Sequence, residues 1–302
     1  MDGEKKLNTD IAGAISSFQS AIKSFELQKK LYKLILRGKG LEFDGYRAYS
    51  SDDDAGTIDW RASKRANSLL VKKYIEEKNL KVVFAIDVGE NMVFGSAEKL
   101  KCEYGAEVIA SLSNLILESG NKIGYFFFNE KVNEFVRPGR GKNHFWRFID
   151  ALTNASLYKG NSDLGNALDF AIDYLDRSIV SIIIVSDFIR VDKGVEDRLA
   201  LVAQKFETMA IMIKDPLDKT LPDISGELVV EDPVTKERLL INPRLARAGY
   251  EKHSAEQEHL VKEMFRKRDI DLLELMTDKP FVVSLATFLK ERTRVVRKRV
   301  SL

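Results

Sequence analysis

The sequence predicts a three-layer α/β domain built around a mostly parallel β-sheet, and two observations carry that prediction. Short apolar runs of strand length alternate with longer segments whose apolar residues recur at helical spacing. Strands separated by helices in this way form βαβ units, in which the strands are parallel. The runs are apolar throughout, which is typical of strands covered on both faces. A chain of 302 residues with 44% hydrophobic residues is long enough to bury such a core.

The composition excludes several classes of protein. The chain has 48 basic and 46 acidic residues, and a net charge of +2 does not support a general affinity for nucleic acid or membranes. The one cysteine, Cys102, excludes a disulfide framework, and its place beside an apolar helix stripe indicates core packing. No apolar run reaches the roughly 20 residues that span a bilayer, and the N-terminus lacks a secretory signal pattern. We therefore expect a cytoplasmic protein with no membrane span.

Residues 1–78 are expected to form a helix and an extended segment that pack on the main domain. Apolar residues at helical spacing predict a helix over Ile11–Arg37, ended by two glycines. The charged segment Gly45–Lys73 follows, and we expect Trp60 to be the buried side chain that anchors it to the sheet.

The main domain is expected over residues 79–302, where strands and helices alternate. The predicted strands are Val82–Ile86, Ile123–Phe128, Ser181–Val185, Met209–Ile213 and Asp271–Leu275. The predicted helices are Leu100–Ile116, Phe145–Leu152, Leu164–Leu175, Arg198–Phe206, Ser254–Lys267 and Pro280–Arg292. Residues 137–142 are expected to form a basic turn. Prolines interrupt the pattern at residues 215–243, where two short strands, Glu227–Glu231 and Arg238–Ile241, predict an inserted β-hairpin.

Polar residues stand where three of these elements meet one edge of the sheet. Asp87 and Asn91 follow the first apolar strand, Ser162 precedes a helix, and Asp187 follows a later strand. Ligands of open parallel sheets bind beyond the carboxyl ends of the strands, so we expect these four side chains to lie close together. Such oxygen atoms suit a hard cation, and Mg²⁺ is the predicted cofactor. Each residue could instead cap a helix, and that alternative stays open.

The order of these residues resembles the von Willebrand factor A fold and its metal-ion-dependent adhesion site. That site has the pattern Asp-x-Ser-x-Ser after the first strand, a later Thr, and an Asp after a further strand. This chain has Asp87, Gly89 and Asn91, then Ser162 and Asp187, so it departs from the pattern at Gly89 and Asn91. The resemblance implies a degenerate site whose metal would bind an acidic residue of a protein partner.

A narrower resemblance covers most of the chain. Residues 49–53 (YSSDD), 58–65 (IDWRASKR) and 232–237 (DPVTKE) are similar to motifs of the MoxR-associated von Willebrand factor A-like family, domain of unknown function 58. The resemblance implies a non-enzymatic adaptor. Such an adaptor would work with a MoxR-type AAA+ ATPase in the assembly or activation of other proteins.

Two functions from other classes remain as alternatives. The segment Asp87-Val88-Gly89 resembles the phosphate loop of actin-type sugar kinases, but the chain contains no Gly-Gly pair for the other nucleotide loops of that fold. The basic tail Arg292–Arg299 could contact nucleic acid, but it has no interleaved aromatic residues for base stacking. The three histidines show neither zinc-pair spacing nor a catalytic triad, so no catalytic residue is predicted.

Overall fold

The computed structural model describes residues 5–24, 41–50, 53–76, 79–189, 191, 194–232 and 236–300, apart from the side chains of 24, 41–44, 73–76 and 293–300. The predicted α/β fold is confirmed. A six-stranded sheet has the order β10-β7-β6-β3-β4-β5, and every neighbouring pair in it is parallel except β4 with β5. Its strands are β3 (Lys81–Asp87), β4 (Lys122–Phe128), β5 (Val132–Gly139), β6 (Ile179–Ser186), β7 (Glu207–Lys214) and β10 (Asp271–Met276).

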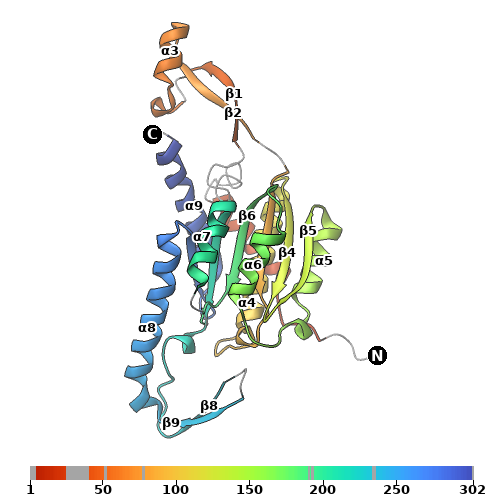
Figure 1. Cartoon of the computed structure of the whole chain (residues 1–302), viewed down its shortest axis with the longest axis vertical. Coiled ribbons are helices and arrows are strands. Elements are labelled where there is room, and N and C mark those ends of the chain that lie inside the picture. The colour runs from red at the N-terminus through yellow and green to blue at the C-terminus, as the bar shows by residue number, and fades with distance from the viewer. Residues whose placement is uncertain are drawn as a thin grey trace.

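Helices cover both faces of the sheet and make the three layers (Figure 1). On one face lie α4 (Lys101–Glu118), α5 (Lys142–Leu152) and α9 (Phe281–Val300), and on the other lie α6 (Leu164–Tyr174), α7 (Val195–Lys205) and α8 (Pro243–Lys267). Strand β3 shows why both cores form. Its side chains alternate, so that Phe84 packs in the first core and Val83 in the second, and both are fully buried.

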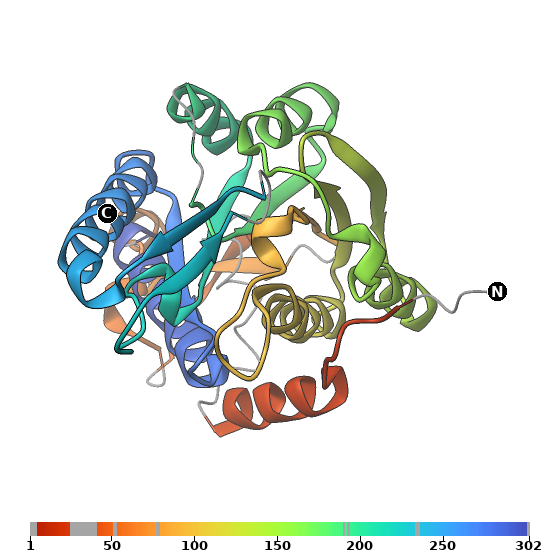
Figure 2. The ribbon, with the colours of Figure 1, turned by 90° about the horizontal axis from the view of Figure 1, so that it is seen from below.

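The N-terminal helix α1 (Ile11–Ser24) packs outside α4 and α9 (Figure 2). Its apolar side chains Phe18 and Ile22 are buried in the core on that side. Two acids of α4 hold its start, because Glu103 accepts a hydrogen bond from the Asn8 backbone and Glu107 accepts one from the Asp10 backbone. The predicted continuation of this helix to residue 37 lies outside the described residues.

Residues 41–76 form a small unit of their own, which projects from the end of the domain opposite the β8–β9 hairpin (Figure 1). Strands β1 (Leu41–Ala48) and β2 (Leu70–Glu76) pair antiparallel, and η1 (Ala55–Thr57) and α3 (Trp60–Ala66) connect them. The prediction that Trp60 is buried against the sheet is wrong, because its side chain is 67% exposed. It starts α3 after the cap residue Asp59, and α3 turns Ala62 and Ser63 inward instead. The boundary between residues 78 and 79 stays a prediction.

Because Trp60 is exposed, Trp60→Ala should change the free energy of unfolding by no more than about 0.5 kcal/mol. The matched core variant Phe148→Ala should cost about 3–5 kcal/mol, since Phe148 is fully buried and stacks on Tyr125. Urea denaturation of both variants measures the difference. A loss from Trp60→Ala as large as that from Phe148→Ala would mean that this side chain is buried.

Several boundaries differ from the prediction. The expected basic turn belongs in part to β5, an antiparallel edge strand. Buried and exposed residues mix along β5, so it contains no continuous apolar run by which the sequence would predict a strand. Helix α8 begins at Pro243 instead of Ser254, because Asn242 caps its first turn with two backbone hydrogen bonds. The predicted hairpin is confirmed as β8 (Leu228–Glu231) paired with β9 (Arg238–Ile241). No helix in the described part of the chain combines the length and the apolar character needed to cross a membrane.

Candidate functional site

The predicted site lies where β3 and β6 end, at the carboxyl edge of the sheet. Figure 2 looks toward this end of the molecule, where the β8–β9 hairpin passes beside the loop that carries η2 (Glu90–Met92). An ion pair of 3.1 Å between Lys236 Nζ and Glu90 Oε2 joins the hairpin turn to that loop. The sequence insertion and the predicted site therefore share one edge.

Three of the four predicted residues meet around one carboxylate. Asp87 is fully buried, and its Oδ2 atom accepts hydrogen bonds from Ser162 Oγ (2.8 Å), Ser186 Oγ (2.6 Å) and Asn91 Nδ2 (3.1 Å). Its Oδ1 atom accepts the backbone N–H of Gly89 at 2.9 Å. The two hydroxyls, the amide and the backbone donor together satisfy a carboxylate that water does not reach.

The two departures from the adhesion-site pattern depend on each other. A Cβ atom on Gly89 would lie 2.2 Å from Asn91 Oδ1 and 3.1 Å from the Ser162 backbone nitrogen. A serine at position 89 therefore cannot coexist with this placement of the Asn91 amide. The larger amide takes the space that a serine side chain would need.

Asp187, the fourth predicted residue, points to a different partner. Its Oδ2 atom accepts a hydrogen bond from Lys101 Nζ at 2.7 Å, and its Oδ1 atom accepts the Ile189 backbone N–H at 3.1 Å. The Lys101 ammonium also lies 3.3 Å from Asp218 Oδ2 and 5.4 Å from the centre of the Phe94 ring. The side chains of Lys101 and Asp187 are each only 2% exposed. Asp187 is thus one member of a buried ion-pair network.

Burial and charge set the pKa values in this network. Burial raises the pKa of Asp87 to about 6, and the charge of Asp187 adds to the rise. Burial opposes the ionisation of Asp187 too, but the ammonium groups of Lys101 and Lys214 hold its pKa below the usual value. Burial acts to lower the pKa of Lys101, and the charges of Asp187 and Asp218 outweigh it, so that pKa is raised. Asp187 and Lys101 are therefore an ion pair at neutral pH.

Sequence reasoning missed four members of this cluster: Ser186, Lys101, Lys214 and Asp218. Two of them carried a signal, because Ser186 and Lys214 each end an apolar strand at the edge where ligands bind. Lys101 begins a helix and Asp218 lies in η4 (Pro216–Asp218), so neither stands at a strand end.

The residues present do not fit one coordination set for Mg²⁺. One observation favours a ligand role: Asn91 Oδ1 is buried and has no hydrogen-bond partner in the described structure. Against it, Asp187 is neutralised by Lys101, and the described residues include no group of three His, Cys, Asp or Glu side chains placed to hold a metal. Metal binding by Asp87, Asn91, Ser162 and Asp187 stays a prediction.

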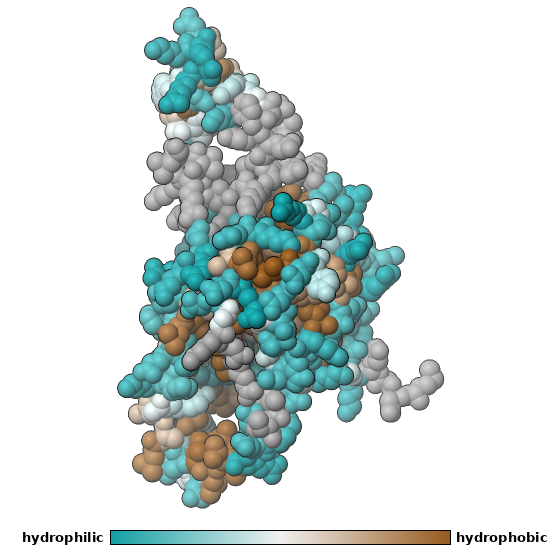
Figure 3. Space-filling model, viewed as in Figure 1, coloured by the Kyte–Doolittle hydropathy of each residue, from teal (hydrophilic) through white to brown (hydrophobic). Residues whose placement is uncertain are grey.

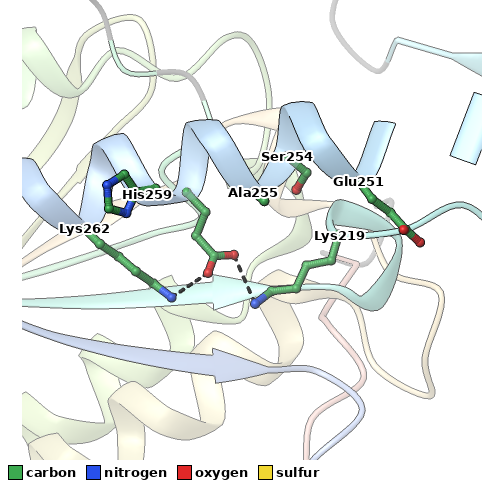
Figure 4. Close-up of a pocket in the computed structure, with 7 residues that line it drawn as sticks. Lys219, Glu251, Ser254, Ala255, His259 and Lys262 are labelled. Carbon is green, nitrogen blue, oxygen red and sulfur yellow. Dashed lines mark hydrogen bonds and ion pairs between the residues drawn. The ribbon is translucent and has the colours of Figure 1, made fainter. Parts of the chain in front are cut away.

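A separate cavity of about 290 Å³ lies along α8 (Figure 4). Glu258 lies between two lysines there, at 3.0 Å from Lys219 Nζ and 2.5 Å from Lys262 Nζ. Lys262 also reaches Glu274 on β10 at 2.5 Å. These charged side chains pair with one another, and the ion pairs join α8 to β10 of the sheet. We therefore assign no second candidate site to this cavity.

Comparisons with known proteins give relatives by sequence and neighbours by structure. The uncharacterized protein Rv1480 of Mycobacterium tuberculosis is 26% identical over 266 residues, which are 86% of this chain and 82% of that protein. Among solved structures, the conserved hypothetical protein BatB of Bacteroides thetaiotaomicron aligns with a TM-score of 0.48 at 12% identity, over 72% of this chain and all of that one. The SpRpn10 VWA domain aligns with a TM-score of 0.42 at 13% identity, over 69% of this chain and 94% of that domain.

The family assignment comes from a match to a family model. The family described as "Protein of unknown function DUF58" matches residues 45–260, well over half of the chain. The match begins in the small N-terminal unit and runs through β3–β7 of the sheet, the hairpin and most of α8, and it ends before β10. The protein therefore belongs to the DUF58 family.

Proposed function

We propose that this protein is a non-enzymatic adaptor that binds a protein partner at the carboxyl edge of its sheet. The exposed apolar surface of the β8–β9 hairpin carries the proposal. Val229, Val230, Leu239 and Leu240 are 40–68% exposed, and Figure 3 shows apolar residues gathered at this end of the molecule. Patches of this kind on monomers mark surfaces that bind other molecules.

The pairing register puts these apolar residues on both faces of the hairpin. Val229 pairs with Leu240, and Val230 pairs with Leu239 at the next position, so neighbouring pairs point to opposite faces. A two-stranded hairpin is marginally stable by itself in water. A partner that covers one face would stabilise the hairpin while it buries apolar surface.

The loop after β3 adds further exposed apolar residues beside the hairpin. The Lys236–Glu90 ion pair joins the two, and Val93 and Phe94 in that loop are also exposed. We call the six exposed apolar residues of the hairpin and this loop the docking edge. The buried charges around Asp87 and Asp187 hold the ends of β3 and β6 and the start of α4, and so support the loop.

The partner expected from the family resemblance is a MoxR-type AAA+ ATPase, and the joint task is assembly or activation of other proteins in the cytoplasm. The resemblance also implies a metal-dependent form, in which an acidic residue of the partner would bind Mg²⁺ at the degenerate adhesion site. The pairing of Asp187 with Lys101 argues against that form. No comparison or contact supports the sugar-kinase alternative. In the nucleic-acid alternative, Arg292 is not available to contact a phosphate group, because it is buried and paired with Glu207 and Asp271.

The double variant Val229→Ser/Leu240→Ser tests the proposal. We expect it to weaken binding to the MoxR-type ATPase of the same organism at least about tenfold, since full burial of a valine or leucine side chain contributes about 1.5–3 kcal/mol and about 1.4 kcal/mol corresponds to a factor of ten. Biolayer interferometry with the two purified proteins measures the dissociation constant.

The control is Leu201→Ser, which removes a leucine that is 51% exposed on α7, away from the hairpin. It should leave the dissociation constant unchanged, and all variants should keep the thermal stability of the natural protein. Equal affinity of the double variant and the natural protein, or no binding by the natural protein, would refute docking of this ATPase through the hairpin.

A further inference from the structure

We infer that the ammonium group of Lys101, which lies between Asp187 and Asp218, replaces a divalent metal ion at the carboxyl edge of the sheet. The fold then needs no divalent ion. Where the proposed docking holds, partner binding needs none either, and this second statement rests on the proposed function.

The contacts of Lys101 support a permanent role inside the protein. Its Nζ atom lies 2.7 Å from Asp187 and 3.3 Å from Asp218, and the three side chains are 2%, 2% and 7% exposed. A buried ammonium group is tolerated only with such partners, because desolvation of an unpaired charge costs several kcal/mol. Removal of the lysine would leave the two buried carboxylates of Asp187 and Asp218 with the ammonium of Lys214 but without the ammonium that contacts both of them.

The position of Lys101 in its helix argues the same way. It is the first residue of α4, where the helix dipole disfavours a positive charge. Its backbone N–H donates to the Phe94 carbonyl at 2.9 Å, so the preceding loop folds over it. The local helix gives no reason for a lysine here, and the two carboxylates give a strong one.

The carboxylate oxygen atoms that a metal would use already accept hydrogen bonds. Both Asp187 oxygens accept hydrogen bonds, one from Lys101 and one from a backbone N–H. Both Asp87 oxygens also accept hydrogen bonds, in this case from neutral hydroxyl, amide and backbone donors. A second buried ammonium, Lys214, interacts electrostatically with Asp187, so an incoming dication would meet two positive charges.

The test uses the isolated full chain and its thermal midpoint. Isothermal titration of the natural protein with MgCl₂ and MnCl₂ should give no binding heat, and EDTA should leave Tm unchanged. Lys101→Ala should lower Tm by about 10 °C, the shift expected when a buried pair of this size is broken in a chain of about 300 residues. Because alanine also opens space beside two carboxylates, millimolar Mn²⁺ should recover part of that loss.

Lys99→Ala is the matched control. Lys99 lies two residues away and pairs with the buried Glu107 at 2.6 Å, but it faces one carboxylate instead of two. This variant should lose some stability and gain no response to Mn²⁺. A response of Lys99→Ala equal to that of Lys101→Ala would contradict the inference, because the recovery would then be non-specific.

Three other results would overturn the inference that Lys101 replaces a metal ion. They are metal binding by the natural protein with a rise in Tm, an unchanged Tm in Lys101→Ala, and a folded Lys101→Ala whose Tm does not rise with Mn²⁺. The titration of the natural protein decides the question even if the variant does not fold. These measurements involve no partner. Failure of the hairpin variants would therefore refute the docking proposal alone, and metal uptake by the natural protein would refute the internal cation alone.

Discussion

Asp187→Leu is expected to lower the free energy of unfolding by about 3–5 kcal/mol, because it leaves the Lys101 ammonium buried with a single, more distant carboxylate. The double variant Lys101→Met/Asp187→Leu should cost clearly less than the two single losses added together. In the double variant the buried charges balance again, with Lys214 and Asp218 left as a pair. Urea denaturation of the four proteins gives the coupling energy, expected at about 2 kcal/mol.

The control is an exposed ion pair with the same chemistry. Lys6 Nζ and Asp150 Oδ1 lie 2.9 Å apart, and both side chains are more than half exposed. Asp150→Leu should therefore change stability by no more than about 1 kcal/mol. Strict additivity of the two single losses in the buried pair would show that Lys101 and Asp187 do not stabilise each other.

The gathering of Asp87, Asn91 and Ser162 could be predicted because it depends on topology alone. In a parallel sheet the residue that follows one strand and the residue that starts a neighbouring helix share the carboxyl edge whatever the side-chain packing. The partner of Asp187 could not be predicted in this way. Lys101 and Asp187 are 86 positions apart, and only the packed position of α4 brings the ammonium group to that carboxylate.

The failure of the Trp60 prediction has a different cause. Large aromatic residues are buried on average, but that average does not hold for a segment whose strands pair only with each other. Residues 41–48 and 70–76 pair with each other instead of with the main sheet, so the whole unit projects and takes Trp60 with it (Figure 1). The strand β5 was missed for a related reason: an edge strand with one open side has no continuous apolar run.

Arg292 shows how a charge that looks like part of a solvated tail can belong to the core. It is 4% exposed, and its guanidinium lies 2.7 Å from Asp271 at the start of β10 and 3.1 Å from Glu207 at the start of β7. Arg292→Met should therefore lower the free energy of unfolding by about 3–5 kcal/mol, because the two acids at the amino ends of β7 and β10 lose their counter-charge. Urea denaturation measures the loss.

Arg266→Met removes the same group from an exposed position, where the arginine is 72% exposed and pairs with Glu263 three residues away in α8. It should change stability by less than about 0.5 kcal/mol. If the two variants lost the same free energy, Arg292 would be a surface charge, and the nucleic-acid alternative would regain that residue. A loss confined to Arg292→Met instead means that α9 is tied by charge at this residue to the starts of β7 and β10.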